Sequence, residues 1–182
     1  MAINNALFML CASVVFTHLA SLGRERGLSS GQASGLVSAL GAANTLGRLG
    51  LGAVMQLPGV RPLGLYAGLY AAAGAATLPV SFVTAVPALV VYAAVFGALS
   101  AALGTVTPEA VIAVCGVRRL AAGLGYVMVF QAAGMLLGGP AAGWVLETSQ
   151  EYHGCFIMAG VAAVAGGGVV VPSWWVLGRR RR

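Results

Sequence analysis

The amino-acid sequence predicts an all-α membrane protein with six transmembrane helices. Of its 182 residues, 59% are hydrophobic and only 8% are charged, whereas about a quarter of the residues in a soluble domain are charged. The mean hydropathy is +0.93. Breakers divide the apolar sequence into six stretches, each with the roughly 20 residues that a helix needs to cross a bilayer core of about 30 Å. This composition cannot supply a water-exposed surface, so the chain is predicted to lie in a membrane.

The first three segments end at short runs rich in charge, glycine or proline. The first runs from about Ala2 to Leu22, lacks the basic n-region of a signal peptide and ends at "GRERG". The second runs from about Ser30 to Gln56 and stops at "LPGVRP". The third runs from about Leu63 to Phe82 and is followed by "VTAVP". These runs predict helix ends.

The last three segments contain more helix breakers. The fourth runs from about Ala88 to Thr107 and meets Pro108, which removes a backbone donor and is predicted to kink the helix. The fifth runs from about Leu120 to Leu146 and is rich in glycine, and the sixth runs from about Cys155 to Leu177.

Glycine pairs spaced four residues apart recur in these segments. Such pairs let helix backbones approach closely inside a membrane, although a composition rich in glycine and alanine also produces them. The pairs are Gly64 and Gly68, Gly134 and Gly138, and Gly139 and Gly143.

The charges orient the segments. Every basic residue is Arg and every acidic residue is Glu. Connections on one side carry Arg61, then Arg118 with Arg119, then the terminal Arg179 to Arg182. Those on the other side carry Arg24, Glu25, Arg26, Glu147 and Glu151. Excess arginine marks the cytoplasmic side of a membrane, so both termini are predicted to be cytoplasmic.

Several function classes are disfavoured. Four of the basic residues form a terminal "RRRR" beside an apolar segment, which is typical of contact with anionic lipid. Nucleic acid would require a broad basic face. The cysteines Cys11, Cys115 and Cys155 show no CxxC spacing, so we expect neither a disulfide framework nor a metal site, and no cofactor. No HExxH occurs, and the two histidines, His18 and His153, both fall near the outer face, so the chain is not predicted to be an enzyme.

One face of the second segment is small and polar. At helical spacing it carries Ser34, Ser38, Gly41, Thr45, Arg48 and Gly52. Arg48 lies eight residues before Gln56, about 12 Å at 1.5 Å per residue. An arginine this deep usually faces a cavity or a partner. Two alternatives are that Arg48 extends to the headgroups or closes an ion pair. Asn44, one turn away, could orient either partner.

Two further residues are candidates for proton coupling. Glu109 follows Pro108 inside the apolar fourth segment, and desolvation would favour its protonated form. Alternatively, Glu109 lies at the inner interface, solvated or paired with Arg118 or Arg119. His18 ends the first segment, where a histidine is more often an ordinary surface group.

Three stretches resemble a known family. "HLASLGRERGLSSGQASGLVSALGAANTLGRLGLG" is similar to the seventh and eighth helices of monocarboxylate transporters, within the major facilitator superfamily. "YAAVFGALSAALGTVTPEAV" is similar to their tenth helix. "RRLAAGLGYVMVFQAAGMLLGGPAAGWVLETSQEYHGCFIMAG" is similar to their eleventh and twelfth. The similarity covers nearly the whole chain in order.

The resemblance implies roles for particular residues. An arginine at the Arg48 position matches the substrate carboxylate, and an acidic residue often stands where this chain has Asn44. Some members have a glutamate at the Glu109 position, and Phe130 and Gln131 fall on a helix that borders the central cavity. Relatives have twelve helices and a lysine on the first, whereas this chain has no lysine.

Residues 1–182 are therefore expected to form one six-helix domain like the C-terminal half of a twelve-helix transporter. Three explanations are open: a truncated or mispredicted gene product, a piece of a longer chain, or a half-size protein paired with another copy. The expected function is transport of small monocarboxylates or related organic anions by alternating access, with a proton as co-substrate, at the plasma membrane. The expected partners are the anion, lipid and a second six-helix half or copy. The alternative is a non-transporting membrane protein that associates with partner helices.

Overall fold

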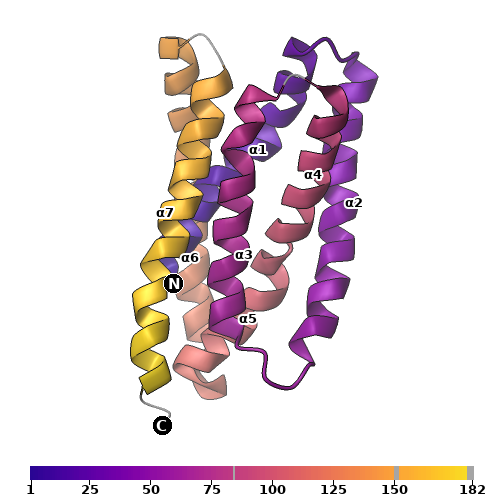
Figure 1. Ribbon diagram of the computed structural model, residues 1–182. Coiled ribbons are helices and arrows are strands. Elements are labelled where there is room, and N and C mark those ends of the chain that lie inside the picture. Colours follow the sequence, from indigo (N-terminus) through magenta and orange to yellow (C-terminus); the bar gives the residue numbers. More distant parts are fainter. Residues whose placement is uncertain (84, 150–151, 180–182) are drawn as a thin grey trace.

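The chain folds into a bundle of long helices. The computed structural model describes residues 1–83, 85–149 and 152–179. Its elements are α1 (Ala2–Glu25), α2 (Ser30–Met55), α3 (Pro62–Thr77), η1 (Pro79–Phe82), α4 (Val86–Ser100), α5 (Ala102–Cys115), η2 (Val117–Arg119), α6 (Leu120–Ser149) and α7 (Tyr152–Arg179). The helices α4 and α5 follow each other within one apolar stretch, Val86–Cys115. Counted in this way, the described residues form the six helical segments that the sequence predicts (Figure 1).

Local sequence explains most helix ends. At the start of α2, the Ser29 hydroxyl accepts from the Gln32 amide and the Gln32 side chain accepts from the Ser29 amide, which is a capping box. Proline stands in the first turn of α3, η1 and α4, where its missing amide costs nothing. Gly116 follows α5 with a φ of 77°, a conformation that favours glycine.

The fourth segment departs from the prediction. Pro108, where a kink was expected, lies inside α5, and the helix is also interrupted earlier, at Ala101. At this interruption Asn44 of α2 forms hydrogen bonds with Gly97 and Ser100, and no local pattern in the fourth segment reveals these contacts. The third segment is also divided, because its helix ends at Thr77 and a short 3-10 turn follows.

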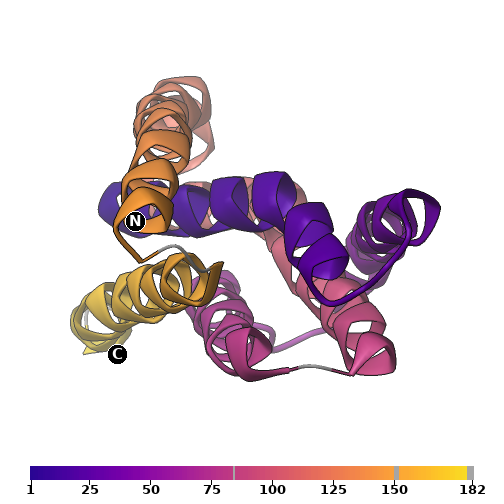
Figure 2. The same ribbon diagram turned by 90° about the horizontal axis from the view of Figure 1, so that it is seen from above.

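The packing places α1 across the bundle. It contacts α6 and α7 extensively and α2 less so, while α3 packs on α7 and α2 packs on α4. Seen from above, α6 and α2 lie on opposite sides of the bundle (Figure 2). The connection from α1 to α2 lies at the upper end in Figure 1, and those after α2 and after α5 lie at the lower end. Arg61, Arg118 and Arg119 therefore lie at one end, as the charge pattern predicts.

Aromatic residues fill the centre. The rings of Phe8 and Tyr70 stack with centroids 4.1 Å apart, and the ring centroid of Phe96 lies 6.3 Å from that of Phe8. All three side chains are fully buried. These contacts join α1, α3 and α4 in one apolar core.

Glycines permit close helix contacts at some of the predicted pairs. A Cβ on Gly138 would lie 2.8 Å from the Ser13 Cβ, and one on Gly134 would overlap the Ala6 backbone. This pair therefore brings α6 against α1. Gly139 and Gly143 have nothing within 4 Å among the residues described, so that pair has no packing role here.

Three stretches of the described chain are long and apolar enough to cross a membrane: Ala2–Glu25, Val86–Cys115 and Val117–Thr148. The second of these spans α4 and α5 together. The helix α2, with 26 residues, is long enough to cross a membrane but is not one of these three stretches.

Candidate functional site

The polar stripe of α2 faces outward. Across the whole of α2, only Ala33, Leu36 and Leu40 are buried. The hydroxyls of Ser34, Ser38 and Thr45 are on exposed residues. Each donates to the backbone carbonyl one turn earlier, at 3.0, 3.2 and 3.1 Å respectively. These hydroxyls bond within their own helix and make no contact to another described helix. The stripe is therefore a small polar surface that no other described helix covers.

Arg48 lies on this surface but is held in place. Its Nε donates to the Asn44 Oδ1 at 3.0 Å. Its guanidinium lies over Gly104 of α5, so closely that a Cβ on Gly104 would be 3.1 Å from an Arg48 terminal nitrogen. The side chain is exposed, and it forms no ion pair with the residues that the structure describes. The positive charge is therefore positioned by neutral groups and not neutralised.

The side chain of Asn44 forms hydrogen bonds within the protein. Its Nδ2 donates to the Gly97 carbonyl at 3.1 Å and to the Ser100 hydroxyl at 2.9 Å. Together with the bond from Arg48, these contacts occupy both ends of the amide. Asn44 therefore joins α2 to α4, in a site where the sequence predicts a substrate contact.

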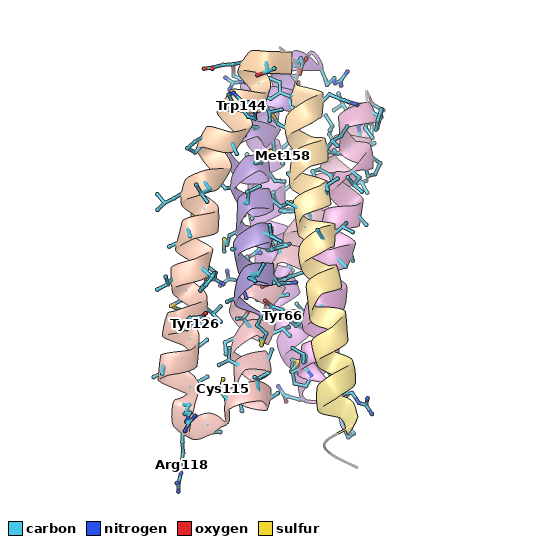
Figure 3. All side chains as sticks on the ribbon, turned by 90° about the vertical axis from the view of Figure 1, so that its left-hand side faces the viewer. Tyr66, Cys115, Arg118, Tyr126, Trp144 and Met158 are labelled. Carbon is cyan, nitrogen blue, oxygen red and sulfur yellow. The ribbon has the colours of Figure 1, made fainter. Side chains whose placement is uncertain are left out.

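Gln131 lies in a different polar group. Its Nε2 donates to the Asn5 Oδ1 at 2.8 Å, and the Asn5 Nδ2 donates to the Tyr66 hydroxyl. Asn5 and Tyr66 are fully buried. This chain of three side chains, from α6 through α1 to α3, is named the α6–α1–α3 link below. Figure 3 shows Tyr66 in the middle of the bundle, to the right of α6.

Phe130 lies on α6 beside Tyr126, with ring centroids 5.0 Å apart. Both rings line an apolar cavity of about 480 Å³, together with Val111 and Cys115 at the end of α5. Tyr126 lies on α6 (Figure 3), and 62% of its surface is exposed. No hydrogen bond among the described residues joins Phe130 or Gln131 to Arg48, so the four predicted binding residues form two separate groups.

The two proton candidates are also apart. Glu109 is exposed on α5, just over one turn after Gly104, and makes no ion pair within the described chain. His18 is partly exposed on α1, and its ring centroid lies 5.7 Å from that of Tyr152 at the start of α7. Neither residue contacts Arg48.

Several residues around these groups were not predicted from the sequence. Ser100 and Gly104 were not singled out, because nothing in the fourth segment shows that they meet α2. Asn5 had a usable signal, since an asparagine in an apolar membrane helix usually has an internal partner. Asn4 beside it is also buried, and its amide has no hydrogen-bond partner among the residues described.

Comparison with known proteins identifies the family. The sequence profile of the Major Facilitator Superfamily matches residues 1–182. The chain belongs to the major facilitator superfamily. It is therefore a multi-pass membrane protein. The members of this family are transporters of small molecules, not enzymes.

Curated relatives narrow the relationship. The chain is 26% identical over 184 residues to monocarboxylate transporter 4 of Mus musculus, covering 100% of this chain and 39% of the relative. It is 30% identical over 161 residues to monocarboxylate transporter 13 of Rattus norvegicus, covering 87% of this chain and 37% of the relative. It is 28% identical over 163 residues to monocarboxylate transporter 12 of Rattus norvegicus, covering 88% and 34%. The chain spans about two fifths of the length of these distant relatives.

Proposed function

We propose that this chain is the C-terminal six-helix part of a transporter that carries small monocarboxylates or related organic anions by alternating access. The observation that carries the proposal is Arg48, an exposed cation held in place by Asn44 without a neutralising carboxylate among the described residues. The names of its relatives, monocarboxylate transporters, support the choice of substrate class.

The geometry suits a carboxylate. Asn44 occupies only the Nε of Arg48, so donors on the two terminal nitrogens stay available. A planar guanidinium binds a carboxylate through two parallel hydrogen bonds. A charged side chain inside a membrane costs about 3 kcal/mol or more unless it meets a cavity or a partner, and a bound anion would supply that partner.

The proposal includes an arrangement in the membrane. The end that carries Arg61, Arg118 and Arg119 would face the cytoplasm, with both termini on that side at the plasma membrane. A second six-helix half, or another copy, would cover the exposed faces of α2 and α6. Transporters of this architecture bind substrate between two such halves.

Arg48 is the residue to test. The chain, alone and together with an N-terminal six-helix half from a monocarboxylate transporter, is reconstituted in proteoliposomes. Uptake of labelled lactate, pyruvate and aromatic acids is then measured. We expect saturable uptake that Arg48→Ala abolishes, whereas Arg61→Ala in the connection after α2 leaves it unchanged. Saturable uptake that survives Arg48→Ala contradicts the anion-binding role, and stable oligomers without flux favour the non-transporting alternative.

Proton coupling is tested separately. Glu109 is the stronger candidate, because it is exposed on the helix that carries Gly104, while His18 lies beside Tyr152. We expect Glu109→Gln to abolish accumulation driven by a pH gradient while leaving exchange of anions intact, and His18→Gln to leave both intact. If Glu109→Gln accumulates substrate normally, Glu109 is not the proton carrier.

A further inference from the structure

The interruption between α4 and α5 leaves a backbone carbonyl without its usual donor. In a continuous helix the Ala101 amide would donate to the Gly97 carbonyl, four residues earlier. Here the Ala101 amide donates to the Leu99 carbonyl instead. Gly97 is buried, and a buried carbonyl without a partner is costly inside a membrane.

Two side chains satisfy this carbonyl. The Ser100 hydroxyl donates to it at 2.9 Å, and the Asn44 Nδ2 donates to it from α2 at 3.1 Å. Asn44 also donates to the Ser100 hydroxyl at 2.9 Å, so the three groups form a closed set. The glycine is needed for this approach, because a Cβ on Gly97 would overlap the Leu40 carbonyl of α2 and would lie 3.1 Å from the Ala43 Cβ. The interruption of the fourth segment is therefore stabilised by α2, which runs beside α4 in Figure 1.

The same asparagine places Arg48. The Asn44 Oδ1 accepts from the Arg48 Nε, and Gly104 just beyond the interruption leaves room for the guanidinium. Arg48 is thus held on one side by Asn44, which also donates to the Gly97 carbonyl of α4. On the other side it lies against Gly104 in the first turn of α5. A change in the angle between α4 and α5 would move both supports of the guanidinium.

We propose that Asn44 is a positioning residue that links the α4–α5 interruption to the location of Arg48, and that it is not a contact to the substrate. This inference rests on the proposed function only where it concerns anion binding. A carboxamide meets both demands, because it donates to the Gly97 carbonyl and accepts from Arg48. An aspartate would accept from Arg48 but could not donate to the carbonyl, and a leucine could do neither.

The test compares Asn44→Asp, Asn44→Leu, Ser100→Ala and Gly104→Ala with a matched control. The control is Gly50→Ala on α2, since a Cβ on Gly50 meets nothing within 4 Å. The first readout is hydrogen–deuterium exchange of residues 97–105 in the purified full chain, which needs no transport. The second is the KM and maximal rate of anion uptake in the reconstituted assembly described above.

The expected results separate the two bonds of Asn44. Loss of the bond to Gly97 should raise amide exchange in residues 97–105 roughly tenfold in both Asn44→Asp and Asn44→Leu. The KM should rise roughly five- to tenfold in both variants, while the maximal rate changes less than about twofold. Gly104→Ala should raise the KM alone, Ser100→Ala should raise exchange to a smaller extent, and Gly50→Ala should change neither quantity.

Three results overturn parts of the reasoning. Wild-type exchange and KM in Asn44→Asp would show that only the bond to Arg48 matters, and the inference would fail. Raised exchange with an unchanged KM would make the link structural and remove the positioning role. If the wild-type assembly shows no saturable flux, or Arg48→Ala retains it, the proposed function fails, while the exchange experiment still decides whether Asn44 stabilises the interruption.

Discussion

Replacing Gln131 tests whether this residue holds the bundle together or contacts substrate. Its Nε2 donates at 2.8 Å to the Asn5 Oδ1, and Asn5 in turn donates to Tyr66. Asn5 has no solvent-exposed surface. In Gln131→Leu, the Asn5 oxygen loses this donor while staying buried, so the α6–α1–α3 link is broken at its α6 end.

The size of the effect follows from two opposing considerations. Leaving a buried acceptor unpaired costs about 1–3 kcal/mol in water-soluble proteins. Hydrogen bonds between membrane helices average only about 0.6 kcal/mol, with a maximum near 1.7 kcal/mol. Because Asn5 is fully buried, we expect a value toward the upper end, about 1.5 kcal/mol. For a protein of this size this lowers the Tm by roughly 3–6 °C.

The protein carries its own reporters for the measurement. Cys11 and Cys155 are buried, and Cys115 is exposed. In a Cys115→Ser background, a thiol-reactive dye would therefore report unfolding of the purified protein through the two buried cysteines. Met128→Ala is the matched control, because Met128 lies on the same helix and is 59% exposed. Its Tm should change little.

A double-mutant cycle with Asn5→Ala isolates the pair. The coupling energy between Asn5 and Gln131 should be about 0.6–1.7 kcal/mol. A Gln131→Leu variant with the wild-type Tm and no coupling to Asn5, but with a raised KM for anion uptake, would refute the reasoning. It would identify Gln131 as a substrate contact, as the family resemblance implies.

Two further predictions test the packing directly. In the folded protein, a maleimide should label Cys115 rapidly, while Cys11 and Cys155 should react only after denaturation; rapid labelling of either buried cysteine would contradict the bundle. Gly97→Ala should destabilise the protein by about 1–3 kcal/mol, because the new Cβ would meet the facing backbone of α2, whereas Gly41→Ala, with nothing within 4 Å, should leave the Tm unchanged.

The helices were predictable from sequence because their causes are local. Apolar runs of membrane length, prolines at helix starts and Gly116 after α5 all act within a few residues of the ends that they set. The contact from Arg48 to Asn44 was anticipated for the same reason, since residues four apart lie on one helix face. Boundaries differ from the predicted ones mainly where a final turn continues, as at Glu25 in α1.

The remaining contacts were not predictable because their partners are distant in sequence. Gln131 and Asn5 are 126 residues apart, and Asn44 and Gly97 are 53 apart. The interruption at Ala101 shows the difference most clearly. Pro108 carries the local signal for a kink, but the interruption lies where Asn44 of α2 donates to the Gly97 carbonyl. The interruption therefore coincides with a tertiary contact that no pattern within the fourth segment contains.

The exposure of α2 and α6 links the fold to the proposed function. Only 11% of the apolar window that includes α6 is buried, against 50% in α1, and α2 buries three residues along its whole length. Lipid tails can solvate the leucines on α6 but not the guanidinium of Arg48 on α2. Asn44 accepts a hydrogen bond from the Arg48 Nε only, so the terminal nitrogens of Arg48 still need acceptors. The described helices leave that charge without a counter-charge, so compensation has to come from an anion, from water, from lipid headgroups or from a partner chain. A partner that covered α2 with an acidic residue would neutralise Arg48 and block anion binding, whereas one that left a water-filled space beside it would create the site.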